Sequence, residues 1–363
     1  MSSPIDVFLL RDTTHGGDPD QATTVATRFS DFAAAAAYSL DLAIYDFRLS
    51  EAFASTVVSA LTAATERGVQ VRLAYDAGKP TDATQATFTA LAADPAPVGT
   101  AQWVTYHFAG TAVQTKAIAA PSGQLMHSKY IVRDAGHRHA AVWTGSANWT
   151  DDAWTRQENN LITVVSSPLA AGYRADFDQL WAAGRITGTG AGDAGTTTAG
   201  GVRLGWDFAP ADGTGLDGFL VQQVRAARHR IVLASMVITS HPLLAALADA
   251  IDRGVPVSGV YDGGQMGPIA AQWHANPNGA EVVANWKLLA DRLVGKPSTP
   301  YQPTSVHDFM HNKVLVTDGH LATGSYNFSA NAQRNAENQL HFVNIGLADQ
   351  FADYAAAIAD AYR

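Results

Sequence analysis

Residues 126–150 of the chain read MHSKYIVRDAGHRHAAVWTGSANWT. In this stretch His127 and Lys129 are followed by Asp134 and then by a Gly-Ser-Ala-Asn segment at 145–148. Apolar runs before and after Asp134 predict two strands that carry these polar side chains. The stretch therefore combines a folding pattern with an unusual concentration of chemically active groups.

The same order of residues returns near the C-terminus. His311, Lys313 and Asp318 repeat the first spacing, and a Gly-Ser-Tyr-Asn segment at 324–327 follows them. With 12 histidines in the chain, one accidental match to H-x-K-x4-D has a chance of roughly one in a hundred, and the following G-S-x-N makes an accident far rarer. Two matches indicate an internal duplication that carries one set of chemical groups twice.

Composition bounds the class of protein. The 363 residues suffice for two lobes, and 47% hydrophobic with 16% charged residues is typical of a compact globular chain. The net charge of −9 disfavours a basic coat for nucleic acid. The absence of cysteine excludes disulfides and Cys-ligated zinc.

Targeting signals are lacking in the sequence. The N-terminus shows no signal-peptide pattern, so we expect a cytoplasmic protein. No apolar run approaches the roughly 18 residues of a membrane helix, so any contact with lipid should be peripheral.

Strand and helix patterns alternate from residue 5 to residue 75 and again from residue 215 to residue 261. This alternation predicts an α/β fold of two similar lobes, each with a central mixed to mostly parallel sheet flanked by helices. We expect an N-terminal lobe at 1–183, a Gly/Thr-rich linker at 184–201 and a C-terminal lobe at 202–363.

Two stretches lack periodicity, and both precede a motif. Residues 78–122 and 265–308 are predicted to be irregular excursions. Their aromatic residues either stack on a substrate or pack within the loops; these are Trp103, Tyr106, Trp273 and Trp286.

The motif residues suit a phosphate group. Residues two apart on a strand share a face, so each His emerges beside its Lys. The lysines Lys129 and Lys313 can neutralise charge, while Asn148 and Asn327 can donate to phosphate oxygens. Two such sets facing one centre would let one histidine attack phosphorus while the other protonates the leaving oxygen.

A second layer of support is predicted around the histidines. Ser146 and Ser325 arrive from the neighbouring strands. Glu158 lies 10 residues after Asn148 (158 − 148), and Glu337 lies 10 after Asn327 (337 − 327). This matched spacing predicts that each carboxylate accepts a hydrogen bond from an imidazole; the alternative is a solvent-facing acid on a loop.

With both motifs complete, the chain resembles the phospholipase D superfamily over nearly its whole length. The resemblance implies a site at the interface of the two lobes, no metal ion or other cofactor, and a phosphohistidine intermediate. It also implies His127 as nucleophile and His311 as general acid, an order that the symmetry of the motifs leaves open. Asp134 and Asp318 match the motif as well, and we expect them in structural ion pairs.

Three further residues are candidate substrate contacts. Asp76 and Asp262 follow matching strands and either contact a head group or cap a turn. Tyr45, just past another strand, is a candidate for lining the pocket.

These observations favour a metal-independent phosphodiesterase that cleaves glycerophospholipids to phosphatidic acid and a free alcohol, or transfers the phosphatidyl group to another alcohol. One alternative is a nuclease acting on DNA or RNA, for which the basic cluster of Arg225, Arg228 and Arg230 is either a phosphate track or a solvated helix face. Another is a binding module without catalysis, which the intact motifs disfavour. Because both motifs lie in one chain, we expect a monomer.

Overall fold

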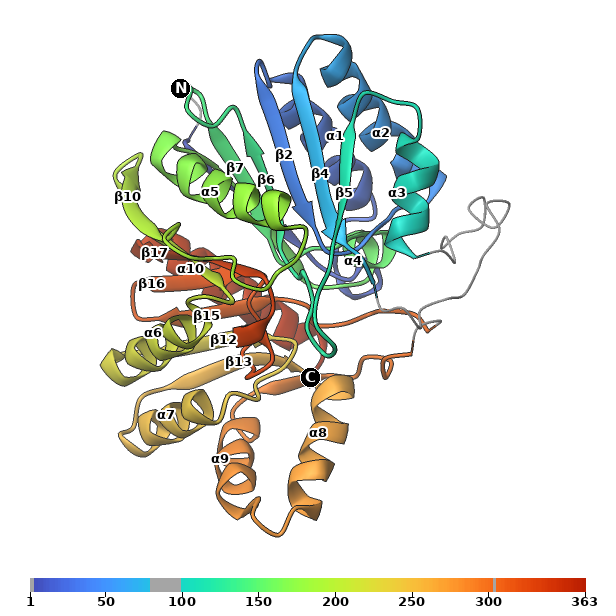
Figure 1. Cartoon of the computed structure of the whole chain (residues 1–363). Helices are drawn as coiled ribbons and strands as arrows, with labels where there is room; N and C mark the ends of the chain where they lie inside the picture. Colours follow the sequence, from blue (N-terminus) through green and yellow to red (C-terminus); the bar gives the residue numbers. More distant parts are fainter. Residues whose placement is uncertain (1–2, 79–98, 303–304) are drawn as a thin grey trace.

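The computed structural model describes residues 3–78, 99–302 and 305–363, which form two α/β lobes, one above the other in Figure 1. The N-terminal lobe is built on a seven-stranded sheet. In spatial order its strands are β1 (Ile5–Leu10), β9 (Asn159–Val165), β7 (Ala141–Gly145), β6 (Lys129–Arg133), β2 (Ser39–Ile44), β4 (Gln70–Asp76) and β5 (Gln114–Ile118).

The C-terminal lobe repeats this order and adds one edge strand. Its strands are β10 (Gly195–Ala199), β11 (Val202–Ala209), β17 (Glu337–Val343), β16 (His320–Gly324), β15 (Lys313–Thr317), β12 (Ile231–Ser235), β13 (Val257–Asp262) and β14 (Val294–Lys296). A small separate sheet pairs β3 (Phe47–Arg48) with β8 (Trp149–Thr150). Without β10 the two large sheets match strand for strand, which is the arrangement that an internal duplication produces.

Both large sheets are mixed, as predicted. The parallel neighbours are β2–β4 and β4–β5 in one lobe and β12–β13 and β13–β14 in the other. The other neighbouring pairs described in these two sheets are antiparallel. Parallel pairing is therefore the minority, because each motif forms an antiparallel hairpin, β6–β7 or β15–β16, in the middle of its sheet.

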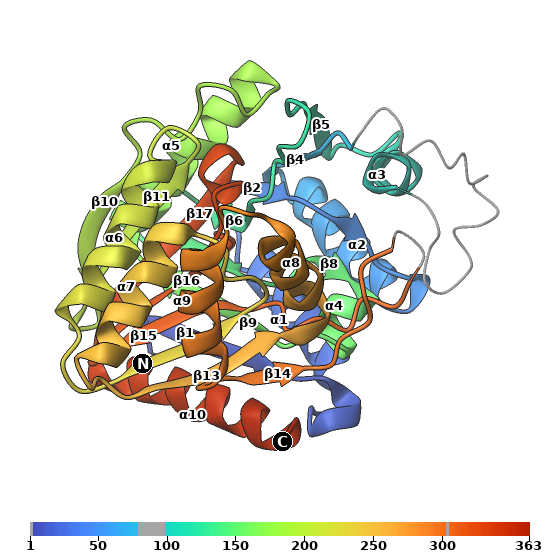
Figure 2. The same ribbon diagram turned by 90° about the horizontal axis from the view of Figure 1, so that it is seen from below.

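Helices cover the outer faces of both sheets and also lie between the lobes. The outer helices are α1 (Gln21–Ala34), α2 (Glu51–Glu66), α3 (Thr100–Phe108) and α4 (Asp151–Thr155) in the first lobe, and α6 (Gly213–Ala226), α7 (His241–Asp252), α8 (Gly263–Ala275) and α9 (Ala280–Ala290) in the second. Figure 2 shows α6, α7 and α9 side by side. The helices between the lobes are α5 (Ser167–Ala183) and α10 (Ile345–Ala361), and the short 3-10 helices are η1 (Thr13–His15) and η3 (Ala332–Arg334).

Local sequence explains where α5 begins and ends. The Ser166 hydroxyl accepts a hydrogen bond from the Leu169 amide, and Pro168 stands in the first turn, where its missing N–H costs nothing. The helix ends at Gly184, whose φ of 63° is the left-handed conformation that glycine adopts readily. These two signals set the span of the helix, Ser167–Ala183.

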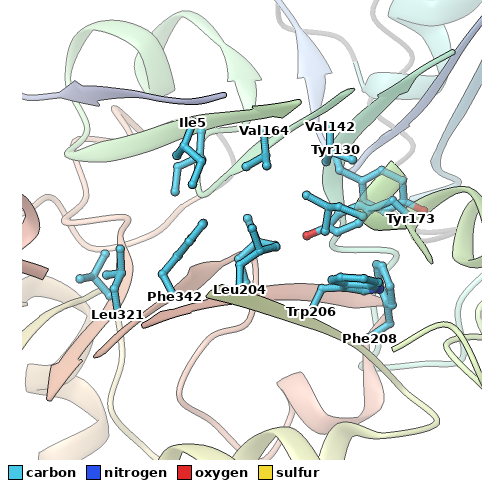
Figure 3. Close-up of a cluster of buried hydrophobic side chains, with 14 of the residues drawn as sticks. Ile5, Tyr130, Val142, Val164, Tyr173, Leu204, Trp206, Phe208, Leu321 and Phe342 are labelled. Carbon is cyan, nitrogen blue, oxygen red and sulfur yellow. The ribbon is translucent and has the colours of Figure 1, made fainter. Parts of the chain in front are cut away.

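A shared apolar core joins the two lobes. In Figure 3, Ile5, Val142 and Val164 of the first sheet face Leu204, Leu321 and Phe342 of the second. Tyr130 and Tyr173 lie in the same core near Trp206 and Phe208. Because both sheets bury a face in one core, the lobes are held together by the hydrophobic effect as well as by the site between them.

Two predictions about irregular segments are wrong. The predicted linker, 184–201, contains β10, which pairs with β11 as an edge strand. The predicted excursion 265–308 contains most of α8, all of α9 and β14. In α9 the buried residues Val282, Trp286 and Leu289 recur at helical spacing, a signal that the sequence carried.

The first excursion also contains regular structure. It includes α3 and β5, while its residues 79–98 lie outside the described parts of the chain. Trp103 is fully buried and donates from its indole to the Leu49 carbonyl, so it packs within the lobe. Trp286 is also buried and contacts Trp273, whereas Tyr106 is about half exposed.

Candidate active site between the lobes

Each motif histidine stands immediately before a central strand and is bonded to the opposite lobe. The His127 amide donates to the Ala336 carbonyl at 2.8 Å, and the His311 amide donates to the Glu158 carbonyl at 3.1 Å. These reciprocal bonds place both histidines at the interface of the lobes, related by the duplication. The backbone amide of each histidine thus bonds to a carbonyl of the other lobe, so neither lobe forms this site alone.

Both motif lysines are buried beside the histidines. The Lys129 ammonium donates to the His127 carbonyl at 2.7 Å, and Lys313 donates to the His311 carbonyl at 2.5 Å. Burial lowers the pKa of Lys129 to about 7, although Glu337 opposes the shift. Burial and the charge of Lys129 also lower the pKa of Lys313. Crowded, desolvated cations of this kind favour a bound anion.

The first histidine has a carboxylate partner from the other lobe. Nδ1 of His127 lies 2.8 Å from Oε2 of Glu337, and the same oxygen accepts a bond from the Ser325 hydroxyl at 2.7 Å. Burial lowers the pKa of His127 to about 4, with Glu337 acting against that shift. A carboxylate at Nδ1 leaves Nε2 of a neutral imidazole with its lone pair free to attack.

The second histidine has an amide partner in the equivalent place. Nδ1 of His311 lies 3.0 Å from Oδ1 of Asn159, which also accepts a bond from the Ser146 hydroxyl at 2.7 Å. Burial is the main cause that lowers the pKa of His311, and the charges of Lys313, Lys129 and His127 add to it. The two histidines and two lysines are therefore close enough for their charges to interact.

The prediction that Glu158 accepts a hydrogen bond from an imidazole is wrong. Its carboxylate accepts from the Lys296 ammonium and from the Tyr362 hydroxyl, both at 2.7 Å. All three side chains come from regions that the motif spacing did not connect. Glu158 is therefore part of a buried ion pair between the lobes, and Lys296 is a partner that sequence reasoning missed.

A one-residue difference in loop length explains this error. The Ser146 amide bonds to the Asn160 carbonyl, 14 residues later (160 − 146), whereas the Ser325 amide bonds to the Asn338 carbonyl, 13 later (338 − 325). The structural counterpart of Glu337 is therefore Asn159. Aligning the apolar positions of β9 and β17 would have revealed it, because Ile162 and Val164 then match Leu340 and Phe342.

The glycine of each G-S-x-N segment allows the strands to approach closely. Gly145 has φ of 151°, and a Cβ atom there would lie 2.0 Å from the Asn160 carbonyl oxygen. The following asparagines, Asn148 and Asn327, are partly buried, and the buried Oδ1 atom of each has no hydrogen-bond partner in the described parts of the chain. An unpaired buried carbonyl oxygen of this kind can accept a hydrogen bond from a donor group on a ligand.

Of the three candidate substrate contacts, Tyr45 lies at the site. Its ring centroid is 4.8 Å from that of His127 and 5.0 Å from the Lys129 ammonium. Asp76 instead accepts bonds from the Met126 and Gly78 amides.

Asp262 plays the same structural part as Asp76 in the second lobe. It accepts bonds from the Met310 and Gln265 amides and from the Ser298 hydroxyl. For both aspartates the structure favours the turn-capping alternative.

The motif aspartates hold backbone amides, not cations. The Asp134 carboxylate accepts bonds from three successive amides, 37–39, and the Asp318 carboxylate accepts from 228–230. The expected structural role is therefore present, but the predicted ion pairs are wrong. Both aspartates have φ of 53°, a conformation that aspartate tolerates better than most residues.

The family is shown by comparison with known proteins. A family described as "Cardiolipin synthase, PLD-like domain" matches residues 30–181 and 220–358, one segment in each lobe. The chain belongs to the phospholipase D superfamily. Enzymes of this superfamily act on phosphodiester bonds, and the match to two segments agrees with the duplication read from the motifs.

One curated member of the superfamily is similar in sequence. A phospholipase D of Rickettsia bellii (strain RML369-C) is 29% identical over 140 residues, which make up 38% of this chain and 61% of that protein. The chain thus matches less than two thirds of the length of this relative.

Solved structures share the fold over nearly the whole chain. Phosphatidylserine synthase from Haemophilus influenzae Rd KW20 has a TM-score of 0.66 at 11% identity, covering 98% of this chain and 88% of that one. Polyphosphate kinase from Porphyromonas gingivalis has a TM-score of 0.56 at 12% identity, covering 96% and 49%. Such different names on one fold mean that the fold does not select a substrate.

The described residues bear on membrane crossing and on metal binding. None of their helices combines the length and the apolar character needed to cross a bilayer. Among these same residues, no group of three or more His, Asp or Glu side chains could hold a metal ion.

Proposed function

We propose that the protein is a metal-independent phosphodiesterase that hydrolyses glycerophospholipids on the head-group side, releasing phosphatidic acid and an alcohol. The observation that carries this proposal is the pairing of His127 with Glu337 and of His311 with Asn159 at one site that also holds two lysines. The lysines supply the positive charge for a phosphate, so activity is expected to survive EDTA.

In the first step Nε2 of His127 attacks phosphorus and forms a P–N bond. His311 takes up a proton from solvent when the anionic substrate binds beside it. As the P–O bond to the head-group alcohol breaks, His311 gives this Nε2 proton to the departing oxygen. Lys129 and Lys313 stabilise the charge on the non-bridging oxygens, and Asn148 and Asn327 orient them. The product is a phosphohistidine on His127 and a free alcohol.

In the second step His311 accepts a proton from water, whose oxygen attacks the same phosphorus. The P–N bond breaks, His127 regains its lone pair, and phosphatidic acid leaves. An acceptor alcohol in place of water would give phosphatidyl transfer by the same movements of protons and electrons.

The unequal partners support this assignment of roles. Phosphorylation turns the His127 ring into a cation, which the Glu337 carboxylate stabilises. A neutral Asn159 does less to stabilise a protonated His311, so this imidazolium releases its proton more readily. We therefore assign His127 as nucleophile and His311 as general acid.

Lipid is the leading substrate class because the segment before the second motif exposes two large apolar side chains. Tyr301 is 57% exposed and Val306 is 44% exposed, both in the segment before the second motif. The names of the similar proteins, a phospholipase D and a phosphatidylserine synthase, agree with a phospholipid substrate. We also propose that the protein is a monomer, that it is cytoplasmic, and that it contacts a lipid surface peripherally.

A nuclease is the second candidate because an aromatic stack lies in the same segment before the second motif. The rings of Tyr301 and His307 are stacked with centroids 5.2 Å apart, and such a platform suits a nucleobase. The basic cluster does not help, because Arg228 and Arg230 adjoin Asp318, which follows the end of β15 remote from Lys313. The net charge of −9 also disfavours this candidate.

The deciding experiment compares the two substrate classes side by side. Purified protein in EDTA is assayed on phosphatidylcholine vesicles and on single-stranded and plasmid DNA, with His127→Ala as the control. Choline release that the variant lacks would support the phospholipase. DNA cleavage without choline release would select the nuclease, and a requirement for a divalent ion would reject the metal-free mechanism.

A further inference from the structure

The C-terminal lobe contains a cavity of about 190 Å³ beneath α6. Gly205 and Ala322 belong to the sheet strands that line it, and Phe219 and Gln223 of α6 line the opposite side. A second hollow, of about 320 Å³, lies at the C-terminal end of α6 and shares Gln223 and His320 with the first. The two spaces are therefore neighbours and provide an approach from the surface.

This cavity is separate from the site between the lobes. It is lined by Thr317 and His320, at the turn of the β15–β16 hairpin, whereas Lys313 and Gly324 are at the other end of that hairpin. At about 3.3 Å per residue, β15 alone spans roughly 13 Å between Thr317 and Lys313. A ligand here would not touch the motif residues.

The N-terminal lobe fills the corresponding place with a tryptophan. Strands β7 and β16 occupy matching positions in the two sheets and both end at the motif glycine, so Trp143 corresponds to Ala322. Trp143 is buried and packs edge-on against Phe29 and Phe32 of α1, with centroids 6.4 and 5.8 Å away. Alanine at this place leaves the space of an indole ring empty.

The helices that cover the two sheets at this place, α1 and α6, also differ in the size of the side chain that they direct at it. Helices α1 and α6 share a spacing of buried residues, seen at Val25, Phe29 and Ala33 and at Leu216, Leu220 and Val224. Aligned on this spacing, Gln223 takes the place of Phe32. Trp143 and Phe32, which pack together in the N-terminal lobe, are thus replaced by Ala322 and Gln223 on the two sides of the cavity.

Unsatisfied polar groups accompany the missing rings. His341 lines the cavity; its Nε2 bonds to Asp207, but its buried Nδ1 has no partner within residues 3–78, 99–302 and 305–363. Gln339, two residues earlier on the same face of β17, also has an amide nitrogen and oxygen without a partner there, but it lies opposite Gly324, away from the cavity. Buried groups of this kind are normally bonded, so they indicate a missing ligand or water.

The open end of the cavity carries free positive charge. Arg203 lines it and is exposed, and its guanidinium group makes no hydrogen bond or ion pair with any described residue. The nearby acids are engaged elsewhere: Asp207 bonds His341, and the Asp318 carboxylate holds three backbone amides. The arginine is therefore free to bind an anionic group.

We propose that this cavity binds a small aromatic acid of indole size. The ring lies under α6 against Ala322 and Phe219, and the carboxylate points to Arg203. The size is suitable, because an apolar cavity of roughly 150 Å³ is enough to bind benzene, and this one is about 190 Å³ with further space beside it. The inference does not depend on the phosphodiesterase activity.

Calorimetric titration of the full chain with indole-3-propionate tests the proposal. Wild-type protein should bind it, and Ala322→Trp should abolish binding because the new indole occupies the cavity as Trp143 does in the first lobe. The melting temperature of Ala322→Trp should not fall. Arg203→Glu should weaken binding of the acid by about tenfold or more, while leaving the uncharged analogue tryptophol unaffected.

The matched control is Arg225→Glu, which makes the same charge change on an exposed residue of α6 that does not line the cavity. This variant should bind like wild type. Absence of binding in wild type, or equal binding by Ala322→Trp, would overturn the proposal, and octanoate binding as tightly as the indole acid would overturn the aromatic class. If Ala322→Trp does not fold, Arg203→Glu with both indole probes still decides the question.

Discussion

His127 and His311 stand at equivalent places in the two lobes, but their Nδ1 atoms face different chemistry. His127 meets the Glu337 carboxylate at 2.8 Å, whereas His311 meets the Asn159 amide at 3.0 Å. In each case a serine hydroxyl bonds to the same partner oxygen. The duplication has preserved geometry and changed charge, and under the proposed mechanism this difference lets two matching motifs carry different steps of one reaction.

The same loop difference gives Glu158 another role. Glu158 precedes Asn159, the residue that bonds the His311 imidazole, by one position. It forms an ion pair with Lys296, and both side chains are almost fully buried. One lobe therefore uses its glutamate for electrostatics at the histidine, while the other uses its glutamate to bind the lobes together. Proximity to a catalytic residue in sequence does not by itself assign a side chain to catalysis.

The largest expected effect separates the two histidines. His127→Ala should lower turnover by about 10⁴-fold or more on any substrate, because the nucleophile is lost. His311→Ala should lower choline release by about 10²- to 10⁴-fold, but should affect release of p-nitrophenol much less, since that leaving group needs no proton. Parallel assays of both products test the difference, and equal losses on both substrates would break the proposed division of roles.

Exchanging the partner chemistry should produce smaller and opposite effects. Glu337→Gln should reduce turnover by about 10- to 100-fold because the ring cation formed at His127 loses its counter-charge. Asn159→Asp should raise the pKa of His311, so that this acid stays protonated to higher pH.

The pH dependence of turnover checks this exchange. The basic limb for Asn159→Asp should move upward by about one pH unit. The isosteric Glu and Gln, and Asn and Asp, serve as mutual controls for shape, and an unshifted limb would argue against a role for the amide.

The ion pair between the lobes should affect stability more than chemistry. Glu158→Gln leaves the buried Lys296 ammonium with only the more distant Asp12 carboxylate, 3.7 Å away, and should lower the free energy of unfolding by about 3 kcal/mol. Turnover at a temperature where the variant is folded should fall less than for Glu337→Gln. Denaturant unfolding measures the first quantity, and the double variant Glu158→Gln/Lys296→Met should recover part of the loss.

The motif aspartates offer a second matched pair. Asp134 is 4% exposed, whereas Asp318 is only partly buried. Loss of three amide acceptors should therefore cost more in Asp134→Ala, about 3 kcal/mol, than in Asp318→Ala, about 1 to 2 kcal/mol. Asparagine at each position tolerates the same φ and keeps one acceptor, so it should cost less. An equal cost for both alanine variants in denaturant unfolding would contradict the burial argument.

Anion binding should become tighter as pH falls, because the pKa values of His127 and Lys129 are lowered in the free site. The pKa of His127 is about 4 against an ordinary 6.5, and that of Lys129 is about 7 against 10.5. Without an anion, stability should fall as pH is lowered from 6.5 towards 4, because His127 takes up a proton only in the unfolded chain. Sulfate should raise both pKa values on binding, so its affinity should increase as pH falls.

Thermal unfolding with and without sulfate measures this effect, and sulfate is suitable because it remains a dianion across the range. The melting temperature should rise by a few degrees, and more at pH 6 than at pH 8. Lys129→Met should reduce both the rise and its pH dependence. A rise that is the same at both pH values would show that the anion binds outside the crowded cations.

Much of the fold and of the candidate site could be predicted, because the motif residues recur at short, fixed spacings in the sequence. Two His-Lys pairs, the G-S-x-N segments and repeated strand patterns predicted two α/β lobes, and the motif histidines and lysines lie together between them. The helical spacing of apolar residues in α9 was present in the sequence, so this helix could have been predicted. Asn159 and Lys296 were not predicted, because their partners come from distant parts of the chain.

The sequence by itself determined the family, the duplication and the set of groups that can handle a phosphate, because these follow from residue types at short fixed spacings. Only the tertiary structure decided that Glu337 serves His127 across the interface, that Asn159 serves His311, and that Glu158 bonds Lys296. A loop longer by one residue moves a side chain to another neighbour. The motif spacing does not reveal this shift, but the shift changes which side chain bonds the histidine, because hydrogen bonds reach only about 3 Å.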